Sequence, residues 1–139
     1  MSSGYAEVQS GTRNVKVYEA GTTTPIVIEA DLPLDANMDY TVFASDEVAM
    51  ITPVFVDDMR EPDPSMAKVR LAHMSPDAPT VDVKLNSGDG PIIFDDVSFQ
   101  AVTAYIGVAP DTYTFVITPG NSNDVVAVLN PVTVEAGGV

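Results

Sequence analysis

Two alternating runs flank a proline-rich turn in the segment Lys68-Val69-Arg70-Leu71-Ala72-His73-Met74-Ser75-Pro76-Asp77-Ala78-Pro79-Thr80-Val81-Asp82-Val83. The apolar positions are Val69 and Leu71, continued by His73, before the turn and Val81 and Val83 after it. A period of two is typical of a strand with one buried face. Proline has no backbone N–H and fixes φ, so the turn cannot continue a sheet ladder. The segment therefore predicts a strand, a turn and a second strand, with Asp82 on the solvated side of the second strand.

The same period of two recurs along most of the chain. The further runs are Val15 and Val17, Ile26 and Ile28, Tyr40 and Val42, and Tyr113, Phe115 and Ile117. Turn signals such as Pro119-Gly120-Asn121 separate them, and the 11 prolines oppose long helices. Many short strands at regular spacing predict an all-β fold, an antiparallel immunoglobulin-like or transthyretin-like β-sandwich.

The composition excludes several classes of partner and chemistry. The 139 residues include 20 acidic and 6 basic side chains, for a formal net charge of −14. Nucleic acid and anionic membrane surfaces need a basic footprint, so neither is expected as a partner. No run reaches the ~18 to 20 apolar residues of a membrane span, so membrane insertion is not expected. The absence of cysteine excludes disulfides, thiolate nucleophiles and cysteine-ligated zinc.

Residues that lie 100 positions apart match in type, which indicates an internal repeat. The matched pairs are Tyr5 and Tyr105, Val8 and Val108, Thr12 and Thr112, Val15 and Phe115, Val17 and Ile117, Asp35 and Glu135, and Ala36 and Ala136. We therefore expect an incomplete tandem repeat. Residues 1–60 form the C-terminal part of a first copy, residues 61–66 a Pro-rich linker, and residues 67–139 a second copy that lacks its last strand.

Residues 67–139 resemble the DUF4397 family, whose members carry a strand, a His-x-Ser-Pro-Asp-Ala-Pro turn and then Val-Asp-Val. Further similarities are Val97-Ser98-Phe99, Tyr105, Asp111-Thr112-Tyr113-Thr114-Phe115 with Asp111 in place of the usual glycine, and Val134-Glu135-Ala136-Gly137. Residues 4–56 resemble the back portion of a preceding copy. The resemblance implies a β-sandwich module that is secreted or displayed on the cell surface, often in tandem, and it implies no particular activity.

The turn of the motif is interpreted as structural, through His73, Ser75, Pro76, Asp77 and Pro79. His73 follows two inward-facing positions, so its ring is expected at the core edge, bonded to Asp77 or to a backbone group of the turn. A metal or catalytic role for His73 is the alternative. Three residues in one tight turn do not easily form a Ser–His–Asp relay, and no nucleophile elbow accompanies them. We therefore predict no catalytic residue, no enzyme activity and no bound cofactor.

Calcium is the one metal for which the sequence offers candidate ligands. Asp89, Asp95 and Asp96 could supply carboxylate oxygens. No calcium-loop spacing is present, so the match is compositional, and solvated loop charges are the favoured interpretation.

The predicted function is that of a non-enzymatic extracellular or cell-surface module with a structural, adhesion or spacer role. A second hypothesis concerns assembly: a strand around Tyr40, Val42 and Phe43 could complete the second copy, within its own chain or in a neighbour. Exchange between neighbours would build an oligomer or filament, with this protein or other surface proteins as partners. A carbohydrate or small-ligand binding module is the third hypothesis, and no ligand is identified.

Overall fold

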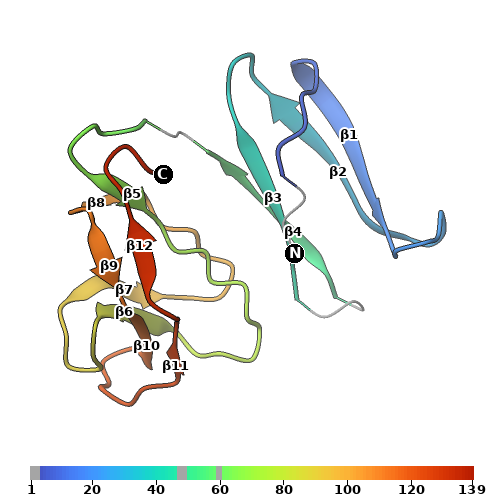
Figure 1. The fold of residues 1–139 in the computed structure, drawn as a ribbon. Coiled ribbons are helices and arrows are strands. Elements are labelled where there is room, and N and C mark those ends of the chain that lie inside the picture. The colour runs from blue at the N-terminus through green and yellow to red at the C-terminus, as the bar shows by residue number, and fades with distance from the viewer. Residues whose placement is uncertain (1–3, 47–49, 59–60) are drawn as a thin grey trace. The chain divides into compact units, whose positions relative to one another are not determined.

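The computed structural model describes residues 4–46, 50–58 and 61–139. The chain divides into two compact units, Met1–Met59 and Arg60–Val139 (Figure 1). The first unit holds β1 (Gly11–Tyr18), β2 (Ile26–Leu34), β3 (Tyr40–Ser45) and β4 (Thr52–Asp57). The second unit holds β5 (Ala67–Val69), β6 (Val81–Leu85), β7 (Ile92–Val97), β8 (Ile106–Val108), β9 (Asp111–Tyr113), β10 (Phe115–Pro119), β11 (Ala127–Val128) and β12 (Val132–Val134).

The predicted all-β class is confirmed. Every pairing between these strands is antiparallel, and the described residues contain no helix. In the part of the chain that the structure covers, no helix is therefore long and apolar enough to cross a membrane.

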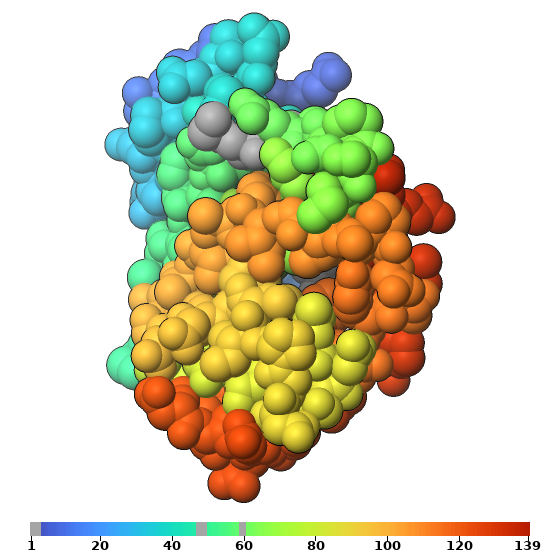
Figure 2. Space-filling model, turned by 90° about the vertical axis from the view of Figure 1, so that its left-hand side faces the viewer, coloured from blue at the N-terminus to red at the C-terminus, as the bar shows by residue number. Residues whose placement is uncertain are grey.

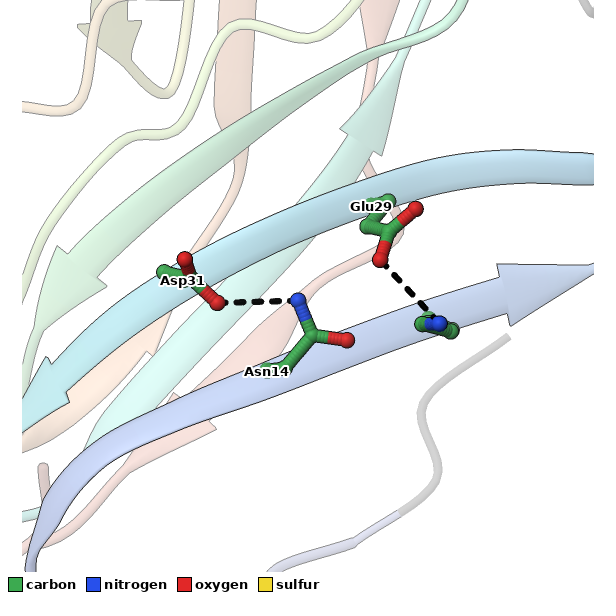
Figure 3. Close-up of polar contacts among 4 residues, drawn as sticks. Asn14, Glu29 and Asp31 are labelled. Carbon is green, nitrogen blue, oxygen red and sulfur yellow. Dashed lines mark hydrogen bonds and ion pairs between the residues drawn. The ribbon is translucent and has the colours of Figure 1, made fainter.

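Strands β1 and β2 form a hairpin whose two faces differ in polarity. Val15 lies opposite Ala30, and Val17 lies opposite the buried Ile28. The other face carries polar cross-strand pairs (Figure 3). There, the Asn14 side-chain amide donates to Asp31 at 2.8 Å, and the Lys16 ammonium lies 3.1 Å from Glu29. The hairpin thus shows the alternation that its sequence predicts.

Strands β3 and β4 form the second hairpin of the first unit, and its faces differ from the prediction. Ser45 is buried, whereas 38% of Val42 is exposed, so Val42 is not on the buried face. Thr41 lies on the same face of β3 as Ser45, and its hydroxyl bonds the buried carboxylate of Asp58. Tyr40 remains half-buried, since its ring stacks on Phe55 with 5.0 Å between ring centroids.

The second unit is a sandwich of two layers. One layer is the four-stranded sheet β11-β10-β6-β7, and the other consists of the pairs β5–β8 and β12–β9. The main cluster of buried residues comes from the first layer, namely Val81, Val83, Phe94, Val97 and Phe115. Residues of the second layer pack against it, among them Val69, Ile106 and Tyr113. The predicted sandwich is therefore present in this unit.

The strand register reproduces the internal repeat. Gly11 pairs with Leu34 in β1–β2, and Asp111 pairs with Val134 in β9–β12, so both partners move by 100 positions. The two hairpins differ at one point. Strand β1 is continuous, whereas β9 and β10 are separated at Thr114, and they belong to different layers of the second unit.

The segment predicted as a linker, residues 61–66, lies within the second unit. Asp63 and Met66 form an isolated antiparallel bridge. The N–H of Gly137 donates to the carbonyl oxygens of Asp63 and Met66, at 2.9 and 3.0 Å. These bonds attach the segment to the C-terminal part of the second unit.

Truncation of two matched residues, one in each copy, tests whether their burial differs as the structure shows. Phe115 is buried in the core of the second unit, whereas its counterpart Val15 is half-buried. Phe115→Ala is expected to lower the free energy of unfolding by about 3 kcal/mol, and Val15→Ala by about 1 kcal/mol. Urea denaturation followed by tyrosine fluorescence measures both. Equal losses would contradict the assignment of Phe115 to a packed core.

Candidate functional site

The His73 ring is bonded to two backbone groups of the motif turn. The N–H of Ser75 donates to Nδ1 at 3.3 Å, so Nε2 carries the proton and donates to the carbonyl oxygen of Pro79 at 3.1 Å. The ring is buried and meets Phe99 edge-on. Ser75 and Asp77 are exposed, and Ser75 reaches the ring through its backbone. Both ring nitrogens thus hold the two ends of the turn together.

The outer face of the four-stranded sheet buries polar side chains. Asp82, Lys84 and Thr118 are 1%, 4% and 0% exposed. The prediction that Asp82 is solvated is therefore wrong. The reason is that residues 120–123, which follow β10, fold over this face: the N–H of Asn121 donates to Asp82 Oδ2 at 3.1 Å.

Lys84 is held by three oxygens from two separate segments. Its ammonium donates to the carbonyl oxygens of Gly88 and Ser122, at 3.0 and 2.7 Å, and to Oδ1 of Asn123 at 2.8 Å. Three donors and three acceptors match the capacity of a lysine ammonium. Lys84 thereby ties the β6–β7 turn to the segment after β10.

A bulge in β7 brings three carboxylates together. Val81 pairs with Val97 and Val83 with Phe94, so Asp95 and Asp96 together lie opposite Asp82. One oxygen from each of these three carboxylates lies within 4.8 Å of the others. Asp82 Oδ1 also accepts the N–H of Asp96 at 2.9 Å. Asp82, Asp95 and Asp96 are called the bulge cluster below.

Of the three predicted calcium ligands, the structure brings Asp95 and Asp96 together and replaces Asp89 with Asp82. Asp89 lies in the turn between β6 and β7, outside the cluster. Figure 2 shows the face of the second unit on which the residues of this hairpin, in yellow, gather. The sequence does carry a signal for the bulge. Phe94 and Val97 are both apolar and both enter the core, with only Asp95 and Asp96 between them. In a regular strand, residues three positions apart point to opposite faces, so one extra residue must be accommodated by a bulge.

The electrostatics of the bulge cluster are those of crowded like charges. Partial desolvation, followed by the charges of Asp82 and Asp96, raises the pKa of Asp95 above its usual range. By contrast, a hydrogen bond from the Ser87 side chain lowers the pKa of Asp89. Asp95 and Asp89 are both exposed and belong to one hairpin, yet their surroundings shift their pKa values in opposite directions.

A groove lies between β5 and β12 in the other layer of the second unit. Its volume is about 330 Å³, and its walls are residues of β5 and β12 together with Gly138 and Val139. Strand β5 pairs with β8 and β12 pairs with β9, so each turns one edge toward the groove. At one end of the groove, the N–H of Lys68 donates to the carbonyl oxygen of Gly138 at 2.8 Å.

These features define an antiparallel β-sandwich module with a buried polar face. The chain belongs to the family described as Domain of unknown function (DUF4397), which matches residues 1–84 and 67–139. The two matches share residues 67–84, which include the His73 turn and most of β6. No curated protein and no solved structure matches the chain.

The role of the His73 ring can be tested with an isosteric change. His73→Phe keeps a ring but leaves the Ser75 N–H and the Pro79 carbonyl without their partner, so we expect a loss of about 2 kcal/mol in unfolding free energy. Ser75→Ala is the control and should change stability by less than about 0.5 kcal/mol. Chemical denaturation measures both. A His73→Phe variant as stable as wild type would show that the ring does not hold the turn.

The buried lysine gives a second test. Lys84→Met removes a buried ammonium that donates to three oxygens, and we expect a loss of about 3 kcal/mol. The matched control is Lys16→Met, which removes an exposed ion pair and should leave the denaturation midpoint near that of wild type. Equal effects of the two substitutions would contradict the structural role of Lys84.

Proposed function

We propose that the protein is a non-enzymatic structural module, outside the cell or at its surface, whose sandwiches are completed by strand pairing between copies. The observation that carries this proposal is the groove between β5 and β12. An open sheet edge offers N–H and C=O groups to another strand. Here β5 and β12 border one groove and, among the described residues, only the Lys68 N–H of β5 is already bonded there, to the Gly138 carbonyl.

The repeat indicates which strand belongs in the groove. In the first copy, β2 is followed by a turn with Asn37 at φ 62°, and β3 begins at Tyr40. In the second copy, β12 is followed by a turn with Gly137 at φ 78°, the position 100 residues later. After this turn, Gly138 already bonds β5. A strand of the β3 type would continue this bonding between β12 and β5.

Strand β3 has the properties of a transferable strand. It pairs with β4 alone among the described strands. Its outer face carries the exposed Val42 beside Phe55, and apolar groups in this position gain from burial. In its own unit β3 pairs along one edge, with β4. In the groove of another copy it would pair along both edges, with β5 and with β12.

Two further observations support a structural rather than a catalytic role. The ring nitrogens of His73, the only histidine, are both bonded to backbone groups of the turn. The net charge of −14 favours a well-solvated surface in a salty exterior. The location outside the cell rests on this charge and on the family resemblance.

The absolute mass in solution tests the proposal. We expect light scattering to show species larger than the 14.7 kDa chain that dissociate over a hundredfold dilution. A peptide with the sequence of residues 38–46 should occupy the groove and reduce the large species, and a scrambled peptide should not.

Val42→Pro provides the matched variant, because proline removes an N–H from the donor strand and leaves the groove intact. This variant should remain at 14.7 kDa and still bind the peptide. Wild-type protein of 14.7 kDa at every concentration would reject exchange between chains. A failure of the peptide to bind Val42→Pro would reject the groove as a strand site.

A further inference from the structure

The bulge cluster concentrates negative charge around one buried carboxylate. Asp82 is 1% exposed, and its two oxygens accept the N–H groups of Asp96 and Asn121. The exposed Asp95 and Asp96 approach it from the bulge, with ligand oxygens within 4.8 Å of one another. This spacing suits a single hard cation, which places oxygens at about 2.3 to 2.6 Å from its centre.

No protein cation neutralises the cluster within the described residues. The nearest lysine in the strand is Lys84, which shares the outer face of β6 with Asp82. Its ammonium is occupied by the oxygens of Gly88, Ser122 and Asn123. The three carboxylates therefore face one another without a counter-charge from Lys84.

Thr118 supplies an independent observation. Its side chain is fully buried, and its hydroxyl has no hydrogen-bond partner. Thr118 is the direct cross-strand partner of Asp82 in the β10–β6 ladder. Directly opposed residues of an antiparallel pair project from the same face of the sheet, so this hydroxyl lies beside the buried carboxylate. A buried hydroxyl without a partner is costly, and a bound ion or its water shell would satisfy it.

The segment after β10 is shaped to let the carboxylates approach. A Cβ atom at Gly120 would lie 2.6 Å from Asp96 Oδ1, so the absence of a side chain there makes room for this oxygen. Asp96 thus reaches from the β7 bulge to the residue that follows β10. The cluster joins β6, β7 and the segment after β10 at one point.

We infer that the bulge cluster binds a divalent cation, with calcium as the best match, through Asp82, Asp95 and Asp96 and with Thr118 beside the ion. Calcium fits because it accepts irregular oxygen geometry and retains water, as an edge with two exposed carboxylates requires. The ion would hold the bulge of β7 against β6 and the segment after β10. Asp89 has no part in this site.

Calcium titration of the full chain, at constant ionic strength, tests the inference. We expect calorimetry to show one site with a Kd of about 10⁻⁴ to 10⁻³ M. Compared with chelator-treated protein, 10 mM calcium should raise the melting temperature by roughly 5 to 10 °C. Wild-type protein with no heat of binding and no thermal shift would overturn the inference.

Two charge-matched variants separate a site from general screening. Asp96→Asn should weaken calcium binding at least tenfold, and Asp89→Asn, on the same hairpin, should leave it unchanged. Equal losses in both, or a retained thermal shift in Asp96→Asn, would mean that calcium only screens the acidic surface.

For two further variants, the melting temperature in calcium-free buffer gives a second readout, so the test does not depend on calcium binding alone. Asp95→Asn should raise the melting temperature there, since it relieves repulsion in the cluster. Thr118→Val should raise it too, because it removes the unpartnered hydroxyl, and it should also weaken calcium binding. A lower calcium-free melting temperature in both variants would show that these groups stabilise the metal-free protein and would contradict the site.

Discussion

Strand β6 is buried on both faces, and the rest of the second unit is arranged around this constraint. Val81 and Val83 enter the core on one side, while Asp82 and Lys84 are withdrawn from water on the other. A buried charge persists only when hydrogen bonds or opposite charges compensate for its lost hydration. Here the compensation comes mainly from the backbone, since amide N–H groups bond the carboxylate and two carbonyls bond the ammonium.

This arrangement explains why distant loops have defined shapes. The turn after β6 must present the Gly88 carbonyl, and the segment after β10 must present both the Asn121 N–H and the Ser122 carbonyl. The bulge in β7 is the third consequence, because it directs the Asp96 N–H toward Asp82. Two side chains of one short strand thus fix three connections that lie up to 39 positions away along the chain.

The sequence predicts the local features of this fold and misses the long-range ones. Alternation identified β6 and β10, and the 100-residue repeat matched residues that the structure then places in the same register in β1–β2 and β9–β12. Both patterns reside in neighbouring or matched residues. The burial of Asp82 depends on a segment almost forty positions away, so an alternating Val-Asp-Val-Lys pattern resembles a strand with a solvated face. The misplaced faces of β3 have a similar origin. There, Thr41 bonds the buried Asp58 on one face, while Val42 on the other face is exposed.

In the candidate site, too, the sequence predicts the local features and misses those that depend on long-range pairing. Asp95 and Asp96 are adjacent in the sequence, so their proximity is a local property that composition reveals. Asp82 joins them only through strand pairing and the bulge, and Thr118 lies opposite Asp82 only through the β10–β6 pairing. Asp89 is excluded because it lies in the turn beyond β6. Residue type alone cannot distinguish an aspartate at a bulge from one in a turn, since both are polar positions in a short hairpin.

The repeat shows how one hairpin sequence serves two settings. In the first unit, β1 pairs with β2 only, and the hairpin stays continuous. In the second unit, β6 offers a partner to residues 115–119, so the matched hairpin breaks at Thr114 and contributes to both layers. The presence of a neighbouring strand therefore decides the shape of the hairpin. Among the described strands, β1, β5 and β12 each pair with one strand only. A net charge of −14 works against indiscriminate pairing at sheet edges, because like-charged copies repel once they approach within a Debye length, about 10 Å in 0.1 M salt. A strand that forms several short-range backbone hydrogen bonds at once can offset that repulsion, whereas a single edge contact gains less.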